Sequence, residues 1–200
     1  MTDVNTEQKI LSAAKQQFIQ KGMAGARMQE IADAAGINKA LLHYYFRNKE
    51  QLFRAVFQST MKEMLPRVFA ILTDEAPLEV KVYQLADKYI DFLSENKALP
   101  LFILSEMQRD PDSIFKGMSI ENIVTFEPLQ EQLDAEAKAG NILPITAQAF
   151  LMNFISLTVF PFVAKPMMQQ VMNWSTESFD RMMQRRKKEI PQFFMNALKP

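Results

Sequence analysis

The chain has 200 residues, with 23 basic and 23 acidic side chains, a single histidine and no cysteine. The balanced charge gives no overall attraction for nucleic acid, and the lack of cysteine excludes disulfides, thiolate nucleophiles and thiolate metal sites. Apolar residues recur at helical spacing, and only five glycines occur. We therefore expect an all-α chain made of a small N-terminal module and a larger domain.

A helix-turn-helix is predicted between Met28 and Tyr45, where the sequence reads MQEIADAAGINKALLHYY. Ala32 is small enough to let two helices cross closely, and Gly36 can take the positive φ that ends the first of them. Leu42 then returns to their shared core. The same spacing also occurs in ordinary helical hairpins, but in a DNA-binding protein it leaves the second helix free to enter a groove.

The second helix of this motif is predicted to have a polar outer face. Asn38 is placed to cap it, so we expect the helix to begin at Lys39. The segment 36–49 holds three basic residues and no acid. Helical spacing turns Lys39, Ala40, His43 and Tyr44 outward, and Leu41, Leu42 and Tyr45 or Phe46 inward. A recognition helix uses such an outer face to contact base edges and phosphates.

From Ile10 to Phe53 the chain resembles the DNA-binding domain of the TetR family of one-component transcriptional regulators. The segment ILSAAKQQFIQKG matches the family's first helix, and EIADAAGINKALLHYYFRNKEQLF carries its Ile-Ala, Ala-Gly, Leu, Tyr-Phe, Lys and Leu-Phe landmarks in register. The resemblance implies an N-terminal three-helix DNA-binding domain over 1–48. It also implies a helical effector-binding and dimerisation domain over 49–200.

Two positions depart from the family's pattern. Ala26 and Arg27 replace a Thr-Ser pair that caps the next helix and touches phosphate, and His43 replaces a common tyrosine. Arg27 and His43 keep the capacity to bind phosphate. The resemblance also implies a phosphate contact for Lys49. The residues expected to bind DNA are Arg27, Asn38, Lys39, Ala40, His43, Tyr44, Tyr45 and Lys49.

The remaining sequence predicts further helices, for about nine in all. The next helix runs from about Lys49 into the seventies, with a kink or break near Pro66. Others are expected over about 78–94, from about 97 to the RDPDS turn, from an entry or kink at 128 to 140, over about 147–163, and from about 179 onward. The basic run 185–188 is expected on a solvated face.

The last two helices carry more apolar surface than one small chain readily buries. In the helix from Ala147 the face opposite the main stripe is also apolar, at Met152, Leu157 and Val159. The resemblance implies a homodimer through a four-helix bundle, and a large monomeric core is the alternative. The expected interface residues are Phe150, Leu151, Phe154, Ile155, Thr158, Phe179, Met182, Met183 and Phe193.

Sixteen phenylalanines and fourteen methionines suit either a plain core or a pocket for an apolar ligand. The resemblance implies an effector pocket among the central helices. Its candidate lining residues are Phe92, Phe102, Met107, Ile123, Phe126 and Phe154. We expect the effector to be an apolar or amphipathic small molecule.

The function predicted from these features is a ligand-responsive transcriptional repressor that binds a near-palindromic operator as a homodimer. The alternative is a dimeric DNA-binding protein without an effector. Enzymatic catalysis is not expected, because the one histidine, His43, stands on the DNA-binding module without a nucleophile beside it, and no metal site or cofactor is expected. The polar N-terminus and the polar breaks within 147–163 predict a cytoplasmic protein that does not span a membrane.

Overall fold

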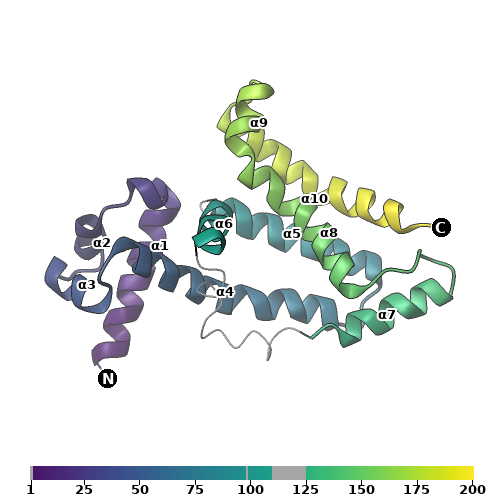
Figure 1. The fold of residues 1–200 in the computed structure, drawn as a ribbon, viewed down its shortest axis with the longest axis horizontal. Coiled ribbons are helices and arrows are strands. Elements are labelled where there is room, and N and C mark those ends of the chain that lie inside the picture. The colour runs from purple at the N-terminus through teal and green to yellow at the C-terminus, as the bar shows by residue number, and fades with distance from the viewer. Residues whose placement is uncertain (1, 98, 110–124) are drawn as a thin grey trace. The chain divides into compact units, whose positions relative to one another are not determined.

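The computed structural model describes residues 2–97, 99–109 and 125–200, and within them the chain is all-α, as predicted (Figure 1). The helices are α1 (Thr2–Gly25), α2 (Met28–Ala34), α3 (Lys39–Tyr45), α4 (Lys49–Thr73), α5 (Leu78–Glu95), α6 (Leu99–Arg109), α7 (Glu127–Lys138), α8 (Ala147–Val163), α9 (Lys165–Val171) and α10 (Thr176–Leu198). The described part thus has ten helices where about nine were expected. The additional helix is the short α9, which the sequence pattern did not predict.

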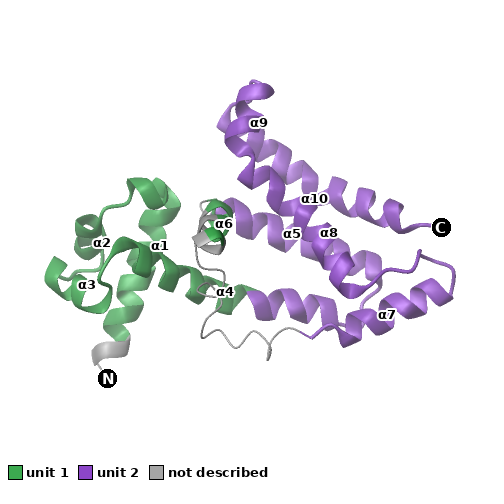
Figure 2. Cartoon of the chain, viewed as in Figure 1, with its two compact units in different colours: residues 1–64, 96–118 green, residues 65–95, 119–200 purple. Residues whose placement is uncertain are grey.

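The chain forms two compact units, coloured separately in Figure 2. The first contains residues 1–64 and 96–118, and the second contains 65–95 and 119–200. The division between these compact units falls inside α4, beside Pro66, and the domain boundary at Lys49 stays a prediction. The first half of α4 belongs to the first unit's core, in which Leu52 and Phe57 are completely buried.

The core of the first unit joins its four N-terminal helices. Ile31 and Ala32 of α2 and Leu42 of α3 have no exposed surface. The rings of Phe18 in α1 and Phe53 in α4 meet edge to face, with 4.6 Å between their centres. Burial of each large apolar side chain stabilises such a core by roughly 2 kcal/mol. Because Leu42 is the buried residue of α3, this helix is held through its inner side.

In the second unit α5 packs against α8 and α10. The predicted apolar face of α5 is confirmed, since its residues Val82, Leu85, Ala86, Ile90 and Leu93 are buried and Tyr89 is partly buried. Phenylalanines from the partner helices fill the other side of this core, notably Phe150 of α8 and Phe194 of α10, whose rings meet edge to face at 4.9 Å.

Lys81 is a buried cation inside this second unit, with only 2% of its surface exposed. Its Nζ donates to the carbonyl of Leu72, 3.0 Å away in the last turn of α4, and to Oε1 of Gln132 in α7 at 2.6 Å. Gln132 in turn donates to the carbonyl of Ala76. Burial lowers the pKa of Lys81, while the negative end of the α4 dipole favours its charge. The network ties α4, α5 and α7 together.

The basic run 185–188 of α10 was expected on a solvated face, but only part of it is solvated. Arg185 is exposed and pairs with Glu189, but Arg186 is partly buried and donates to the carbonyl of Leu157 in α8 at 2.7 Å. Lys187 bridges Asp87 and Asp91 of α5, at 3.0 and 2.6 Å. Two of the four cations therefore link α10 to its neighbours.

Among the described helices, none is by itself long and apolar enough to cross a membrane. Only α8 and α9 taken together, across a 65° bend, reach the length and composition that a span requires.

Candidate functional site

The turn between α2 and α3 has the glycine geometry predicted for it. Gly36 takes a φ of 69°. Its N–H donates to the carbonyl of Asp33 at 3.1 Å, and the N–H of Ile37 donates to the carbonyl of Ala32 at 3.0 Å. This pair of hydrogen bonds is a Schellman motif, which ends a helix sharply and favours glycine at the left-handed position. The turn therefore fixes the angle at which α3 leaves α2.

Asn38 caps α3, and the helix begins at Lys39, both as predicted. The Asn38 Oδ1 accepts the N–H of Leu41 at 2.7 Å. An N-cap of this kind stabilises a helix by about 1 kcal/mol. This hydrogen bond engages the side-chain oxygen of Asn38, which therefore stabilises the first turn of α3.

The outer face of α3 is open to solvent. Lys39, Ala40, His43 and Tyr44 are all exposed, and Tyr44 retains 79% of its surface. On the inner face Leu42 is completely buried and Phe46, just past the helix, nearly so. Leu41 was expected to face inward, but it is 37% exposed. A helix of seven residues buries only a narrow stripe, and Leu41 lies outside it.

Two aromatic residues stand side by side at the end of α3. The rings of Tyr44 and Tyr45 meet edge to face, with 5.6 Å between centres. Tyr45 is half-buried while Tyr44 projects into solvent. Tyr45 thus supports the position of Tyr44, which is the more accessible of the two.

The ring of His43 is anchored by one of its nitrogens. Its Nδ1 lies 3.1 Å from the carbonyl oxygen of Arg47. A carbonyl oxygen can only accept a hydrogen bond, so Nδ1 carries the hydrogen in this contact. Nε2 is then the nitrogen that remains for another partner.

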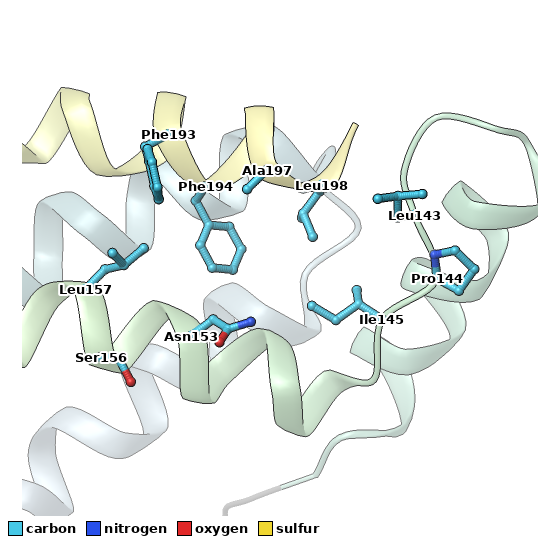
Figure 3. A pocket seen from close by; sticks show the side chains of 10 residues that line it. All are labelled: Leu143, Pro144, Ile145, Asn153, Ser156, Leu157, Phe193, Phe194, Ala197 and Leu198. Carbon is cyan, nitrogen blue, oxygen red and sulfur yellow. The ribbon is translucent and has the colours of Figure 1, made fainter. Parts of the chain in front are cut away.

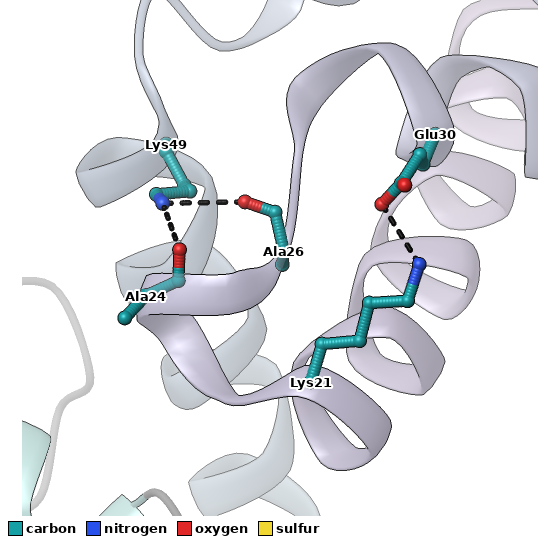
Figure 4. A network of polar contacts seen from close by, with 5 residues as sticks. All are labelled: Lys21, Ala24, Ala26, Glu30 and Lys49. Carbon is teal, nitrogen blue, oxygen red and sulfur yellow. Dashed lines mark hydrogen bonds and ion pairs between the residues drawn. The ribbon is translucent and has the colours of Figure 1, made fainter.

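The loop before α2 has no hydroxyl cap, because Ala26 and Arg27 stand where a Thr-Ser pair would supply one. Arg27 is the N-cap residue, with extended backbone and no capping side-chain hydrogen bond, and its side chain is exposed. Two other contacts brace this loop (Figure 4). Lys21 pairs with Glu30 at 2.9 Å and holds the pKa of Glu30 below its usual range. Lys49 donates from α4 to the carbonyls of Ala24 and Ala26.

The second unit contains aromatic residues at part of the predicted effector region. Phe92 stacks on Tyr89 at 6.3 Å, and Phe154 lies 6.4 Å from the same ring. Burial raises the pKa of Tyr89 to about 12. Phe126 packs edge to face on Phe69. Ile123 and the side chains of Phe102 and Met107 lie outside the described part of the structure.

A hollow of about 430 Å³ lies elsewhere in this unit, between α8, the C-terminal end of α10 and residues 143–145 (Figure 3). Phe193, Phe194 and Leu157 form much of its apolar wall, and the polar side chains of Asn153 and Ser156 lie along α8. None of the predicted effector residues lines it.

The structure divides the predicted dimer residues into two groups. Phe150, Phe154, Thr158, Phe179 and Met183 are buried within their own chain, at 3% exposure or less. They lie where α5, α8 and α10 pack against one another, so they have almost no surface to offer a second chain. Leu151, Ile155, Met182 and Phe193 remain partly or largely exposed. Sequence periodicity identified the apolar residues but did not separate these two faces.

The sequence comparisons agree on the N-terminal segment. A family model described as "Bacterial regulatory proteins, tetR family" matches residues 10–56. The HTH-type transcriptional regulator RutR of Escherichia coli strain K12 is 44% identical over 69 residues, which are 34% of this chain and 32% of RutR. The chain therefore matches about a third of the length of this relative.

Solved structures with the same fold extend over the whole chain. A putative TetR-family transcriptional regulator from Mesorhizobium loti superposes with a TM-score of 0.67 at 21% identity, covering 100% of both chains. The transcriptional regulator FadR from Bacillus subtilis, solved in complex with stearoyl-CoA, gives a TM-score of 0.63 at 16% identity over 96% of this chain and 98% of FadR. At these identities the likeness concerns the fold.

Proposed function

We propose that this chain is a transcriptional regulator of the TetR family and not an enzyme, and that it represses transcription by binding a near-palindromic operator as a homodimer. The observation that carries the proposal is the outer face of α3. It is exposed, and Gly36 and Asn38 fix the direction of α3 and its first turn. A helix held in this way can enter the major groove of DNA.

The exposed residues of α3 suggest a division of roles at the DNA. We assign base-edge contacts to Lys39, Ala40 and Tyr44, which lie on one side of the helix. Arg27 and His43, with support from Tyr45, are assigned to the phosphate backbone. Replacement of Lys39 or Tyr44 is therefore expected to alter sequence preference, whereas loss of Arg27 weakens binding to all sequences alike.

The homodimer is proposed to form through the exposed parts of α8 and α10. Phe193 keeps 64% of its surface, and Ile155 and Met152 on α8 are also exposed. Solvent-exposed apolar side chains of this size on neighbouring helices are typical of a surface that a partner covers. A second copy of the chain would cover them symmetrically.

The effector is proposed to be an apolar or amphipathic small molecule that binds the second unit and releases the operator. The aromatic side chains of Tyr89, Phe92 and Phe154 support this assignment, because they gather large apolar surfaces around one buried hydroxyl. The same fold in FadR holds stearoyl-CoA. A protein with these roles acts on chromosomal DNA in the cytoplasm.

Selection of duplexes from a random-sequence pool with the purified chain tests DNA binding and symmetry together. We expect enrichment of an inverted repeat whose half-sites are about one helical turn, or a multiple of it, apart. Enrichment of no sequence would overturn the proposal, and a single unpaired half-site would overturn the dimer.

Thermal unfolding in the presence of compounds tests the effector. A ligand that binds only the folded state raises the midpoint of unfolding, and the stabilisation grows with the logarithm of one plus its concentration over its Kd. We expect stabilisation by long-chain acyl compounds or other amphipathic molecules, together with release of the selected duplex. Stabilisation by none of them would leave the effector-independent DNA-binding protein as the better description.

A further inference from the structure

Lys49 makes contacts that its place in the family pattern does not explain. It is the first residue of α4, and its Nζ lies 3.3 Å from the carbonyl oxygen of Ala24 and 3.2 Å from that of Ala26 (Figure 4). An ammonium group has three N–H donors, and these two carbonyls take two of them. The side chain is half-buried. Lys49 thus bonds to its own chain at the point where a DNA-facing lysine was expected.

The two carbonyls stand at the end of α1 and in the loop that leads to α2. The last carbonyls of a helix have no hydrogen-bond partner inside the helix and carry partial negative charge. These carbonyls therefore stabilise a cation such as the Lys49 ammonium group. Ala26 is buried, with its N–H donated to the carbonyl of Gly22. Lys49 therefore fastens this loop to α4.

Apart from the burial of Ala26 and its bond to Gly22, the other side-chain contacts near this loop are weak. Arg27 gives α2 no side-chain cap. The Lys21–Glu30 pair is roughly 40% exposed on both sides, and exposed pairs of this kind contribute little. The backbone between Ala24 and Arg27 sets where Arg27 projects and where α2 begins, so its position depends on Lys49.

We infer that Lys49 supports operator binding as a positioning residue that fixes the α1–α2 loop and Arg27, and not by neutralising a phosphate itself. The inference rests on the proposed DNA-binding function. The two roles differ in a measurable way, because each phosphate contact releases condensed counterions and steepens the salt dependence of binding by about one unit in log Kd against log salt. A residue that acts only through Arg27 can change the slope while Arg27 is present, but leaves it unchanged once Arg27 has been replaced.

The test compares Lys49→Met with Arg27→Met in the full-length chain, using a duplex selected by the wild-type protein from a random pool. Binding is measured at several salt concentrations, with the active fraction fixed by stoichiometric titration. We expect Lys49→Met to weaken binding by roughly tenfold, since it removes two charge-assisted hydrogen bonds. Arg27→Met should lower the slope by about one, and adding Lys49→Met to Arg27→Met should lower it no further.

Lys49→Gln provides the second variant, because its amide keeps N–H donors without a charge. Positioning predicts that Gln recovers part of the affinity lost with Met. A double variant, Arg27→Met with Lys49→Met, whose slope is lower by about one than that of Arg27→Met alone would identify a direct phosphate contact and overturn the inference. Wild-type affinity in Lys49→Met would overturn it as well.

A measurement without DNA separates this inference from the proposed function. If Lys49 fixes the loop, backbone amides of residues 24–30 exchange their hydrogens faster in Lys49→Met than in the wild type. Unchanged exchange would overturn the positioning role even if the protein binds DNA as proposed. Faster exchange in a protein that selects no duplex would instead leave the role in the fold intact and contradict the proposed function.

Discussion

His43 can donate to a phosphate only in its charged form, because of its contact with Arg47. The carbonyl of Arg47 takes the hydrogen on Nδ1, so Nε2 carries a hydrogen only when the ring is doubly protonated. A phosphate contact by this side chain would therefore use Nε2 of the doubly protonated ring.

We predict that His43→Ala weakens binding to the selected duplex and to unrelated duplexes by a similar, severalfold factor, because it removes the ring assigned to the phosphate backbone. His43→Tyr should bind much as the wild type does, because a phenol also donates a hydrogen bond. Fluorescence anisotropy with labelled duplexes measures both variants. Wild-type affinity in His43→Ala would contradict the phosphate role of this residue.

At the scale of helices, α10 supplies a hydrogen bond that α8 cannot make within itself. Pro161 has no N–H, so it gives no hydrogen bond to the carbonyl of Leu157 four residues earlier. Arg186 of α10 donates to that carbonyl from outside the helix. The contact also has an unfavourable part. Burial lowers the pKa of Arg186, and its Nε has no hydrogen-bond partner among the described residues. The guanidinium is held where the proline leaves an acceptor open.

We predict that Arg186→Met destabilises the chain by about 1–3 kcal/mol, since it leaves a buried carbonyl without a donor. In a Pro161→Ala background the helix supplies its own N–H to Leu157, so the same substitution should cost less. Urea unfolding of the wild type, both single variants and the double variant gives this difference as a coupling energy. Equal effects of Arg186→Met in the two backgrounds would show that the bond to Leu157 is unimportant.

The ion pairs between α5 and α10 make a second helix-scale prediction. The hydrogen bond from Lys187 holds the pKa of Asp87 below its usual range. Burial opposes the charge of Lys187, but hydrogen bonds to Asp91 and Asp87 outweigh it and raise its pKa. The carboxylate contribution is therefore present above about pH 4 and lost as the pH falls through the lowered pKa of Asp87. The contribution of Lys187 is present below about pH 10 and lost as the pH rises through its raised pKa.

Replacement of both carboxylates, Asp87→Asn with Asp91→Asn, should lower the free energy of unfolding at pH 7 by less than about 1 kcal/mol, because both side chains are nearly half exposed. The difference from the wild type should shrink as the pH approaches 3. Chemical unfolding at several pH values measures it, with Glu131→Gln on the exposed side of α7 as control. A difference that persists unchanged at low pH would contradict the ion-pair account.

The parts that could be predicted from sequence are those governed by local rules. The cap at Asn38, the positive φ of Gly36 and the apolar stripe of α5 involve residues within one or two turns, so spacing alone identifies them. The contacts of Lys49 and Arg186 join residues 23 to 29 positions apart. No periodicity encodes such pairs, and the same is true of which apolar face of α8 its own chain covers.

For the molecule as a whole, DNA binding as proposed depends on two recognition helices being held together. One α3 helix of seven residues covers few base pairs, and two half-sites read by a dimer multiply the specificity. The apolar surface left exposed on α8 and α10 is the part of the chain best suited to this association, with Phe193 as its most exposed large side chain on α10.

We predict that Phe193→Glu converts the protein from dimer to monomer, because a carboxylate placed at that surface would have to be buried without a partner. Light scattering after gel filtration should then give a mass near 23.1 kDa instead of twice that value. Affinity for the selected inverted repeat should fall by at least about 100-fold as avidity is lost. Val80→Glu, at an exposed apolar position of α5, is the matched control and should stay dimeric. A Phe193→Glu protein that remains a dimer with wild-type affinity would place the interface on another surface of the second unit.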